Sequence, residues 1–452
     1  MKTLIKNGNI VTPQKSYYSE ILIEDEKIKE IIDCYTGDYD RVIDAQGKYI
    51  LPGIIDAHTH MGIPIMGTWS SDDFESGSIA AAFGGVTTII DFTVQKKGQS
   101  LPDSLRERMK LAEGKSYVDY TFHCNVTDFT ETTTSEMESV LDMGVCSFKT
   151  FMAYKQAWMM LRDDQLLQVY AKAAALDAIA MLHAENGDLI DFVTDRLISA
   201  GKETAKNYPN SRPVESEIEA VHRGIFLAEA TGVTLYIVHL TSGGALQLIH
   251  QAQKKGLTII AETCPQYLLF NRDIYEGEEG HCFIASPPFR EKSDCDYLWQ
   301  GIQKGWISTV GTDHCPFTRE QKYSGLGKFH TTPNGLPGVE TLLTLLYSEG
   351  VRKKRLTINK LIEVLCENPA RTFKLYPQKG CIREGSDADL VIFDPLKETT
   401  LSASTLHSNT DWSPYEGWEV TGAPSHVFLR GQEIVRDEEI TTTNLTGKYL
   451  SC

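Results

Sequence analysis

The stretch "GIIDAHTH", residues 53–60, joins a short apolar run to two histidines. Side chains two apart on a strand point the same way, so His58 and His60 would present their imidazoles on one face. Neutral imidazole is a common ligand of transition metals. By itself an H-x-H pair is a weak signal, because both histidines could be solvated or lie in the core. Whether His58 and His60 bind a metal therefore depends on whether other apolar runs in the chain also end in metal-ligating residues.

Seven more short apolar runs follow, and longer helix-like stretches separate them. The runs occupy residues 87–92, 119–124, 146–151, 178–185, 235–240, 257–263 and 307–313. Among the stretches between them, residues 163–177 and 243–256 have helical character. Eight strands that alternate with helices predict an α/β fold, a (β/α)8 TIM barrel. A doubly wound open sheet is the alternative that periodicity alone leaves open.

The two ends of the chain differ from this middle part, because both consist of short strand-like runs and turns. Residues 1–50 carry Asn-Gly and Gly-Lys turn pairs, and residues 380–452 continue in the same style. Neither end is large enough to form an independent domain. We therefore expect them to pair into one discontinuous β module, with residues 51–379 forming the barrel domain.

Composition narrows the classes of partner. The 452 residues include 44 Lys and Arg against 61 Asp and Glu, giving a formal net charge of −17 without a basic cluster, which argues against nucleic acid and against an anionic membrane surface. No run approaches the roughly 20 apolar residues of a membrane span, and the N-terminus lacks a secretory apolar region. The ten cysteines form no CxxC motif, which suits reduced thiols in the cytoplasm.

Metal-ligating residue types recur where the predicted strands end. His183 ends the fifth run, His239 the sixth and Asp313 the eighth. Each histidine alone could be a core residue bonded to a backbone carbonyl, and Asp313 alone could cap the next segment. The C-terminal ends of barrel strands, however, converge on one active site. Together with His58 and His60, these residues predict a metal centre, in which Asp313 could also take a proton from water.

A lysine occupies the middle of the fourth run, "SFKTFMAYK", residues 147–155. The ammonium of Lys149 would be costly to bury unless it is paired or neutralised. Near divalent cations and out of water its pKa should fall, and the neutral amine could react with carbon dioxide to give a carbamate whose two oxygens bridge two metals. An ordinary buried ion pair with Asp91 or Glu262 is an equally good interpretation of the residues alone.

At this point the sequence resembles a known group, the cyclic amidohydrolases, and within it the dihydropyrimidinase and D-hydantoinase family. The matching segments include "LPGIIDAHTH", "SFKTFMAYK", "HAENGD", "ETCPQYL", "SPPFREK", "VGTDHCPF", "PNGLPGVE", "EGSDADLVIFDP" and "DWSPYEGW". They occur in order from about residue 50 to residue 420, so the resemblance covers nearly the whole chain. As a set they are highly specific.

The resemblance implies a (β/α)8 barrel with a β-sandwich built from both chain ends, and a site with two divalent metal ions. The metals would be zinc, with manganese or cobalt as alternatives. One would be held by His58, His60 and Asp313, the other by His183 and His239, with carboxylated Lys149 (N6-carboxylysine) as the bridge. The family's substrate-binding and oxyanion-binding positions match Tyr154, Ser286 and Asn334, with Tyr154 and Asp313 as catalytic residues.

The activity that the resemblance implies is hydrolysis of the cyclic amide bond in dihydropyrimidines and 5-substituted hydantoins, giving N-carbamoyl amino acids. It also implies a small cyclic ureide as substrate and a homodimer or homotetramer in the cytoplasm. An allantoinase-like enzyme and a non-catalytic scaffold of the same family are alternatives, although the scaffolds have lost ligands that this chain keeps. A dihydroorotase is disfavoured, because Gly62 stands where that subfamily commonly has an arginine.

The loop after the first strand, "GIPIMGTW", is unusually apolar for a segment that leaves a strand end. Apolar residues also follow Tyr154. Matching positions in D-hydantoinases line a pocket for the ring substituent, which would here be formed by Ile63, Ile65, Phe151 and Trp158. Ordinary packing of one loop against another is the alternative.

Overall fold

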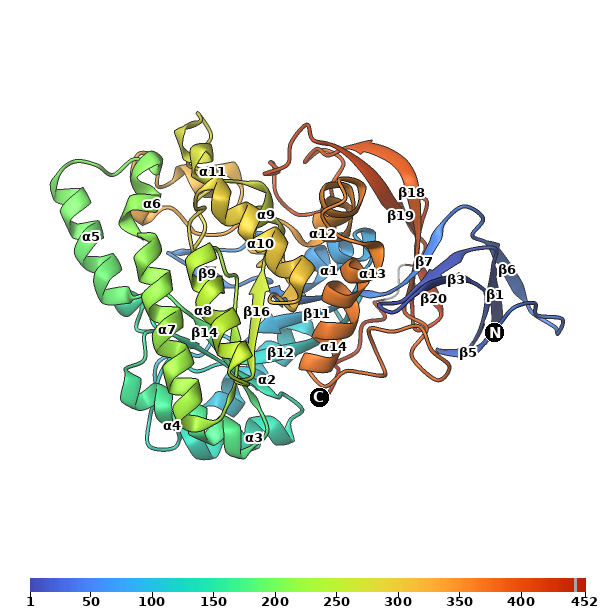
Figure 1. The fold of residues 1–452 in the computed structure, drawn as a ribbon, viewed down its shortest axis with the longest axis horizontal. Coiled ribbons are helices and arrows are strands. Elements are labelled where there is room, and N and C mark those ends of the chain that lie inside the picture. Colours follow the sequence, from blue (N-terminus) through green and yellow to red (C-terminus); the bar gives the residue numbers. More distant parts are fainter. Residues whose placement is uncertain (443–444) are drawn as a thin grey trace.

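The computed structural model describes residues 1–442 and 445–452, and a barrel of eight parallel strands lies at its centre (Figure 1). The strands run in chain order around the barrel, from β8 to β17. They are β8 (Ile54–Thr59), β11 (Val86–Phe92), β12 (Asp119–Asn125), β13 (Ser147–Phe151), β14 (Ile179–His183), β15 (Thr234–Ile237), β16 (Ile259–Thr263) and β17 (Thr309–Val310). A parallel bridge between Thr59 and His314 brings the first and last strands together. The predicted α/β barrel is confirmed.

Helices surround the barrel because each buries one apolar stripe against the strands. In α8 (Gly243–Lys254), Leu246, Ile249 and Ala252 are buried, and Ser242 caps the N-terminus. The other long helices are α1 (Phe74–Phe83), α2 (Leu101–Ala112), α3 (Thr133–Asp142), α4 (Asp163–Ala175), α5 (Gly187–Ser199), α7 (Val214–Thr231) and α10 (Lys292–Lys304). The helices predicted at 163–177 and 243–256 thus form with ends shorter by two residues.

Short helices fill the connections at the two ends of the barrel. They are α6 (Tyr208–Ser211), α9 (Pro265–Leu269), α11 (Arg319–Tyr323), α12 (Leu342–Leu345), α13 (Ile358–Ile362) and α14 (Asn368–Thr372). Single 3-10 turns are η1 (Lys155–Ala157), η2 (Ala205–Asn207), η3 (Arg272–Glu276), η4 (Phe329–Thr331) and η5 (Val339–Thr341), and η6 (Leu346–Arg352) and η7 (Glu363–Glu367) are π-helical.

Besides a two-stranded hairpin of β9 (Pro64–Ile65) and β10 (Thr68–Trp69), two larger sheets lie beside the barrel, and both draw on the N-terminal part of the chain (Figure 1). The first contains β1 (Lys2–Lys6), β4 (Glu20–Glu24), β5 (Lys27–Ile32) and β6 (Arg41–Asp44). The second contains β2 (Asn9–Val11), β3 (Ser16–Tyr18), β7 (Tyr49–Pro52), β18 (Leu390–Thr400), β19 (Glu419–Leu429), β20 (Gln432–Arg436) and β21 (Glu439–Ile440). Strand β7 pairs with β18, which joins the two ends of the chain.

The two sheets share one apolar core. Ile5 and Ile21 from the first sheet belong to the same buried cluster as Ile50, Ile392 and Phe428 from the second. Burial of such aliphatic side chains stabilises a sheet pair by roughly 1.5–3 kcal/mol per residue. The last residues of the chain leave these sheets and lie against the barrel, where Leu450 donates its backbone N–H to Tyr120 of β12.

A buried ion cluster joins the sheets to the barrel. The ammonium of Lys379 lies 2.7 Å from Asp389 and 2.9 Å from Asp387, both just before β18, and it also bonds Asp119 of β12. Arg430, at the end of β19, pairs with Asp119 as well. These five side chains are almost fully buried. Here charge complementarity sets the relative position of the barrel and the sheets.

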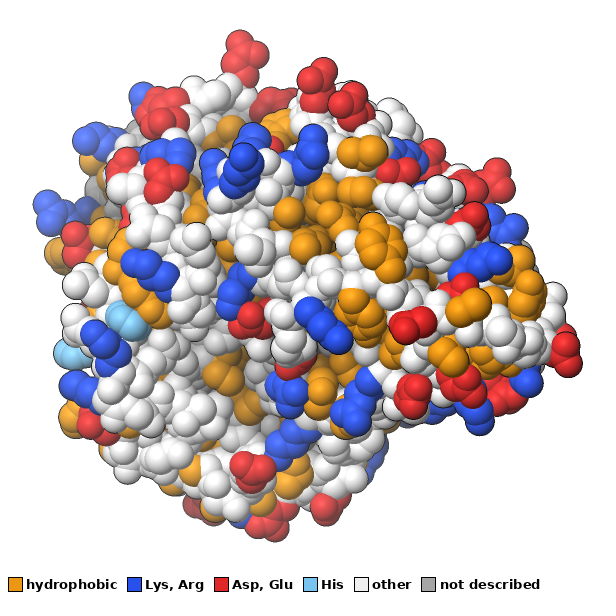
Figure 2. All heavy atoms as spheres, turned by 45° about the vertical axis from the view of Figure 1, so that its right-hand side comes forward, with side chains coloured by type: hydrophobic (Ala, Val, Ile, Leu, Met, Phe, Trp, Pro, Cys, Tyr) orange, Lys and Arg blue, Asp and Glu red, His pale blue; other side chains and the backbone are white. Residues whose placement is uncertain are grey.

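The surface has mixed charge. On the face drawn in Figure 2, acidic and basic side chains are interspersed over the barrel and the sheets. In the part of the chain that the structure describes, no helix is both long and apolar enough to cross a membrane.

Candidate metal centre

Three of the predicted ligands meet where the first and last barrel strands end. His58 lies on β8, and His60 follows that strand directly. Their Nε2 atoms lie 3.2 Å and 3.0 Å from the same oxygen, Oδ1 of Asp313. Asp313 has a left-handed φ of 53°, which turns its carboxylate at the mouth of the barrel. Two imidazole nitrogens and a carboxylate oxygen are a ligand set that suits a divalent transition metal.

Two more histidines form a second pair of ligand atoms beside the first group. Nδ1 of His183, at the end of β14, lies 2.9 Å from Nε2 of His239, which follows β15. His239 also has a left-handed φ, of 39°. The rings of His58 and His239 are 5.5 Å apart between centroids, so the two groups share one site.

Lys149, on β13, points into the same region. Its Nζ lies 5.0 Å from the centroid of Phe92 and 5.4 Å from that of Phe151. Its ammonium makes no hydrogen bond or ion pair with any other residue that the structure describes. Asp91, which could have paired with it, is bound by Arg108 instead. Lys149 is therefore a buried amine without a structural ion pair.

The electrostatics keep three buried histidines and Asp313 in the protonation states that metals bind. Burial lowers the pKa of His58, His183 and His239 below the ordinary value, so these imidazoles are neutral at pH 7. Burial also lowers the pKa of Lys149 to about 8, against the pull of the nearby carboxylates. For Asp313, burial raises the pKa, but the surrounding His58, His60 and Lys149 outweigh it and the pKa falls.

Two buried carboxylates fix the ring orientation of His58 and His183. Glu262, on β16, lies 2.7 Å from Nδ1 of His58 and accepts the backbone N–H of His239 at 3.0 Å. Glu185 lies 2.8 Å from Nε2 of His183 and is held in turn by Arg212. Such outer partners fix the ring orientation and leave the other nitrogen for a metal. Burial raises the pKa of Glu262 to about 7.

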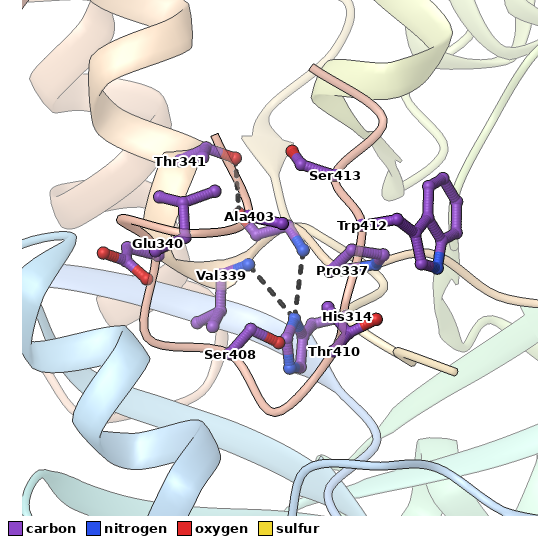
Figure 3. Close-up of a pocket in the computed structure, with 12 residues that line it drawn as sticks. His314, Pro337, Val339, Glu340, Thr341, Ala403, Ser408, Thr410, Trp412 and Ser413 are labelled. Atoms are coloured by element: carbon purple, nitrogen blue, oxygen red, sulfur yellow. Dashed lines mark hydrogen bonds between the residues drawn. The ribbon is translucent and has the colours of Figure 1, made fainter. Parts of the chain in front are cut away.

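A fifth histidine, His314, supports Asp313 at the end of the last strand. His314 directly follows that aspartate, and its Nδ1 accepts the backbone N–H groups of Gly338 and Val339 at 3.0 and 3.2 Å (Figure 3). Its Nε2 lies 2.9 Å from Asp72, which also accepts the backbone N–H of Asn409 at 2.7 Å. His314 is thus fully buried and bonded on both nitrogens, and a small cavity lies beside it.

Tyr154, Ser286 and Asn334 lie together on one side of the histidines. The ring of Tyr154 is 4.7 Å from that of His183, and the hydroxyl of Ser286 lies 2.7 Å from that of Tyr208. The Ser286 hydroxyl also accepts a hydrogen bond from the Asn334 amide at 2.9 Å. Burial raises the pKa of Tyr154, which keeps its phenol protonated and able to donate a hydrogen bond.

The four predicted pocket residues lie in two segments of the chain and differ in their exposure to solvent. Ile63 is buried with Cys315 and Phe317, and Ile65 packs against that cluster. Phe151 is buried next to the ring of His183, at 5.9 Å between centroids. Trp158 follows η1 and is 74% exposed, with the ammonium of Lys97 above its ring.

The residues that orient the ligands were missing from the predicted site. Glu262 ends the seventh predicted strand, so the same strand-end criterion could have found it. Arg212 and Asp72 lie in connecting segments, where the sequence carries no signal that they are buried. His314 adjoins a predicted ligand but has no second histidine two residues away to mark it.

Comparison with known proteins agrees with this geometry. A sequence profile described as "Amidohydrolase family" matches residues 49–434. The chain belongs to the amidohydrolase family, whose members this barrel and this group of histidines, lysine and aspartate resemble.

The sequence identities of individual relatives place the chain in a smaller group within that family. A D-hydantoinase of Geobacillus stearothermophilus is 42% identical over 454 residues, covering 100% of this chain and 96% of the relative. The crystal structure of dihydropyrimidinase from Brevibacillus agri NCHU1002 is 40% identical with a TM-score of 0.98, covering 100% and 98% of the two chains. L-hydantoinase (dihydropyrimidinase) from Arthrobacter aurescens is 32% identical with a TM-score of 0.93, covering 100% and 99%. The chain thus falls in the hydantoinase and dihydropyrimidinase group of amidohydrolases.

Proposed function

We propose that this protein hydrolyses the ring amide of 5-substituted hydantoins and dihydropyrimidines and releases N-carbamoyl amino acids. The observation that carries the proposal is the convergence of four histidines, Asp313 and an unpaired buried lysine at one end of the barrel. The full-length similarity to proteins named for hydantoin and dihydropyrimidine hydrolysis supports the choice of substrate. Because both D- and L-hydantoinases are among the relatives, the stereochemical preference is a matter for assay.

The donor set fits two divalent metal ions, which would be zinc, manganese or cobalt. His58, His60 and Asp313 would hold one, and His183 and His239 would hold the other. Lys149, whose amine has no partner among the described residues, would bridge them as its carbamate. When bound, such ions polarise a carbonyl and lower the pKa of water toward neutrality. The ammonium would first lose one proton to solvent, and the neutral amine would lose a second as its nitrogen adds to carbon dioxide, so the carbamate is an anion that balances the cations.

The chain's own groups would position the substrate and move the proton. The protonated phenol of Tyr154 would donate a hydrogen bond to the oxyanion that forms when water adds to the ring carbonyl. The backbone groups of Ser286 and Asn334 would hold the ring amide and its urea portion. Asp313 would accept a proton from the attacking water and return it to the ring nitrogen as the C–N bond breaks.

A panel assay of ring opening tests this proposal. The purified protein is assayed on dihydrouracil, dihydrothymine, hydantoin, phenylhydantoin, allantoin and dihydroorotate, and its metal content is measured on the same sample. We expect turnover of the hydantoins and dihydropyrimidines together with about two metal ions per chain. Turnover confined to allantoin, or a protein without zinc, manganese or cobalt after gentle purification, would contradict it.

We also propose that the enzyme is cytoplasmic and that it is a homodimer or homotetramer. Phe192 on α5 and Phe226 on α7 remain 59% and 66% exposed on helices that contact each other, which supports burial of this face against a second copy. Light scattering would measure the mass, and a monomer at micromolar concentration would contradict the assembly.

A further inference from the structure

Lys322, on the short helix α11, is a second buried lysine, and it lies outside the metal centre. It is fully buried, and its ammonium donates to two backbone carbonyls, those of Ile284 and Pro333, each at 2.8 Å. The ring of Phe317 lies 5.5 Å from its Nζ. No carboxylate that the structure describes forms an ion pair with it. Burying a cation without an ionic partner costs free energy, so we expect Lys322 to hold other groups in position.

The two carbonyls belong to the segments that carry the proposed amide-binding residues. Ile284 lies two residues before Ser286, and Pro333 directly precedes Asn334. The segments are also bonded to each other, through Gly335 N–H to the Ile284 carbonyl at 3.1 Å and the Asn334 amide to the Ser286 hydroxyl at 2.9 Å. Lys322 therefore binds both segments at once through its ammonium.

The backbone groups of Ser286 and Asn334 are free to bind a ligand. Neither their N–H nor their C=O groups make a hydrogen bond with another residue in the described part of the chain. Backbone polar groups held near a buried site without partners are uncommon, because most are satisfied within the fold. The orientation of these backbone groups must then be set by neighbouring residues. The two carbonyls that bond Lys322 lie close by in the chain, at Ile284, two residues before Ser286, and at Pro333, one residue before Asn334.

Lys322 is itself held in place. Thr318 caps α11 and forms a capping box with Gln321, and the Gln321 amide donates to the backbone carbonyl of Trp69 at 2.8 Å. The carbonyl of Lys322 accepts from Nε2 of His281 at 2.8 Å. The lysine is thus a fixed donor, and the two segments bonded to its ammonium take their position from it.

We propose that Lys322 is a positioning residue, which holds the Ile284 and Pro333 carbonyls so that the backbone of Ser286 and Asn334 faces the ring amide of the substrate. The proposal rests on the hydrolysis proposed above. Lys322 does not touch the substrate, so it should affect binding of the ring far more than the chemical step.

The test compares Lys322→Met with wild type, and with Lys328→Met as a control, since Lys328 is exposed in the same segment. The KM and kcat for hydantoin and dihydrouracil and the metal content are measured for each protein. We expect K322M to raise KM at least about fivefold, the scale of one or two lost hydrogen bonds, with kcat changed by less than about threefold. Its metal content should match wild type, and K328M should be unchanged in every measurement.

An unchanged KM in folded K322M would overturn the proposal, and so would a loss of metal or a fall in kcat of the same size as the rise in KM. If K322M does not fold, K322Q takes its place with the same criteria, because a shorter carboxamide cannot reach both carbonyls. Wild type without any ring-opening activity would contradict the proposed function instead, so the two failures are distinguishable.

Discussion

At the level of single residues, Lys149 gives the most direct test of the metal centre. Lys149→Ala removes the amine that would bridge two cations, so we expect less than one metal per chain and a loss of activity beyond the roughly 10–100-fold typical of outer-shell changes. Metal analysis and a hydantoin assay on one sample measure both. Lys155→Ala is the control, because Lys155 is exposed and pairs only with Asp188 on the surface. A K149A protein that kept two metals would exclude the bridge.

Lys322 makes a separate prediction about stability and pH. Burial lowers its pKa from 10.5 to about 7, so between these values the unfolded chain binds more protons than the folded one. Its contribution therefore destabilises the fold at low pH, and this penalty disappears as pH rises from about 7 to 10.5. Cys282 and Cys315 act on this pKa in the opposite direction, but burial outweighs them.

We expect wild type to gain unfolding free energy relative to K322M as the pH rises over that range. The gain should be up to roughly 1.4 kcal/mol per pH unit. Denaturant titrations at a series of pH values measure the difference, in which the other titrating groups cancel. Parallel stability curves for the two proteins would show that the lysine does not titrate on folding.

Some residues were predictable and others were not, for physical reasons. The ligand candidates could be predicted because strand ends of a barrel converge, so position along the chain implies position in space. Lys322 could not, because it lies in the polar segment "REQKYSGLG", which looks solvent-exposed. Its burial depends on contacts with residues 284 and 333, and the sequence carries no local trace of them.

At the level of elements, the eight strands were predicted correctly in number and order, but several end early. The run 307–313 forms only β17 (Thr309–Val310), because the strand pairing ends at Val310 and Asp313 takes a left-handed conformation. The run 235–240 likewise ends as a strand at Ile237. Alternation of apolar residues cannot report such turns, which depend on φ at single positions.

The segment after β13 carries a prediction about substrate choice. Trp158 is 74% exposed where η1 ends, four residues after Tyr154, and we propose that it contacts the ring substituent. Trp158→Ala should lower the ratio of activity on phenylhydantoin to that on dihydrouracil by roughly tenfold, the scale of a lost apolar contact. Trp158→Phe keeps an aromatic face and should retain most of the ratio. Equal ratios in all three proteins would remove Trp158 from the proposed pocket.

At the level of the whole molecule, the ion cluster around Lys379 joins the barrel to the two sheets. Lys379→Met would leave Asp119, Asp387 and Asp389 buried together without their common cation. We expect a loss of about 3–5 kcal/mol in unfolding free energy, the usual result of removing one partner from a buried ionic group. Urea denaturation measures it.

The matched control for this change is Lys96→Met, since Lys96 pairs with Glu107 on the surface, where both side chains are more than half exposed. A surface pair contributes about 1 kcal/mol at most. If K379M and K96M had the same unfolding free energy, the ion cluster would not stabilise the contact between the barrel and the sheets.

The composition of the two sheets follows from the sequence only in part. Strand-like runs at both ends of the chain predicted a joint β module, and we propose residues 1–50 and 380–452 as its discontinuous domain. The partner choices within it, such as β7 with β18, depend on long-range packing that no local pattern encodes. The same holds for Leu450, which returns to the barrel.

The contacts of Asp72 have a consequence for anyone who builds chimeras of this protein. Asp72 accepts hydrogen bonds from Ser408 and from the backbone of Asn409, in the loop between β18 and β19, while its other contact is His314 beside Asp313. A graft that exchanged the C-terminal sheet strands for those of a relative would replace this loop as well. In such a hybrid, Asp313, which we propose to be catalytic, would be supported by a loop from another protein, so the crossover points should keep residues 401–418 with the barrel.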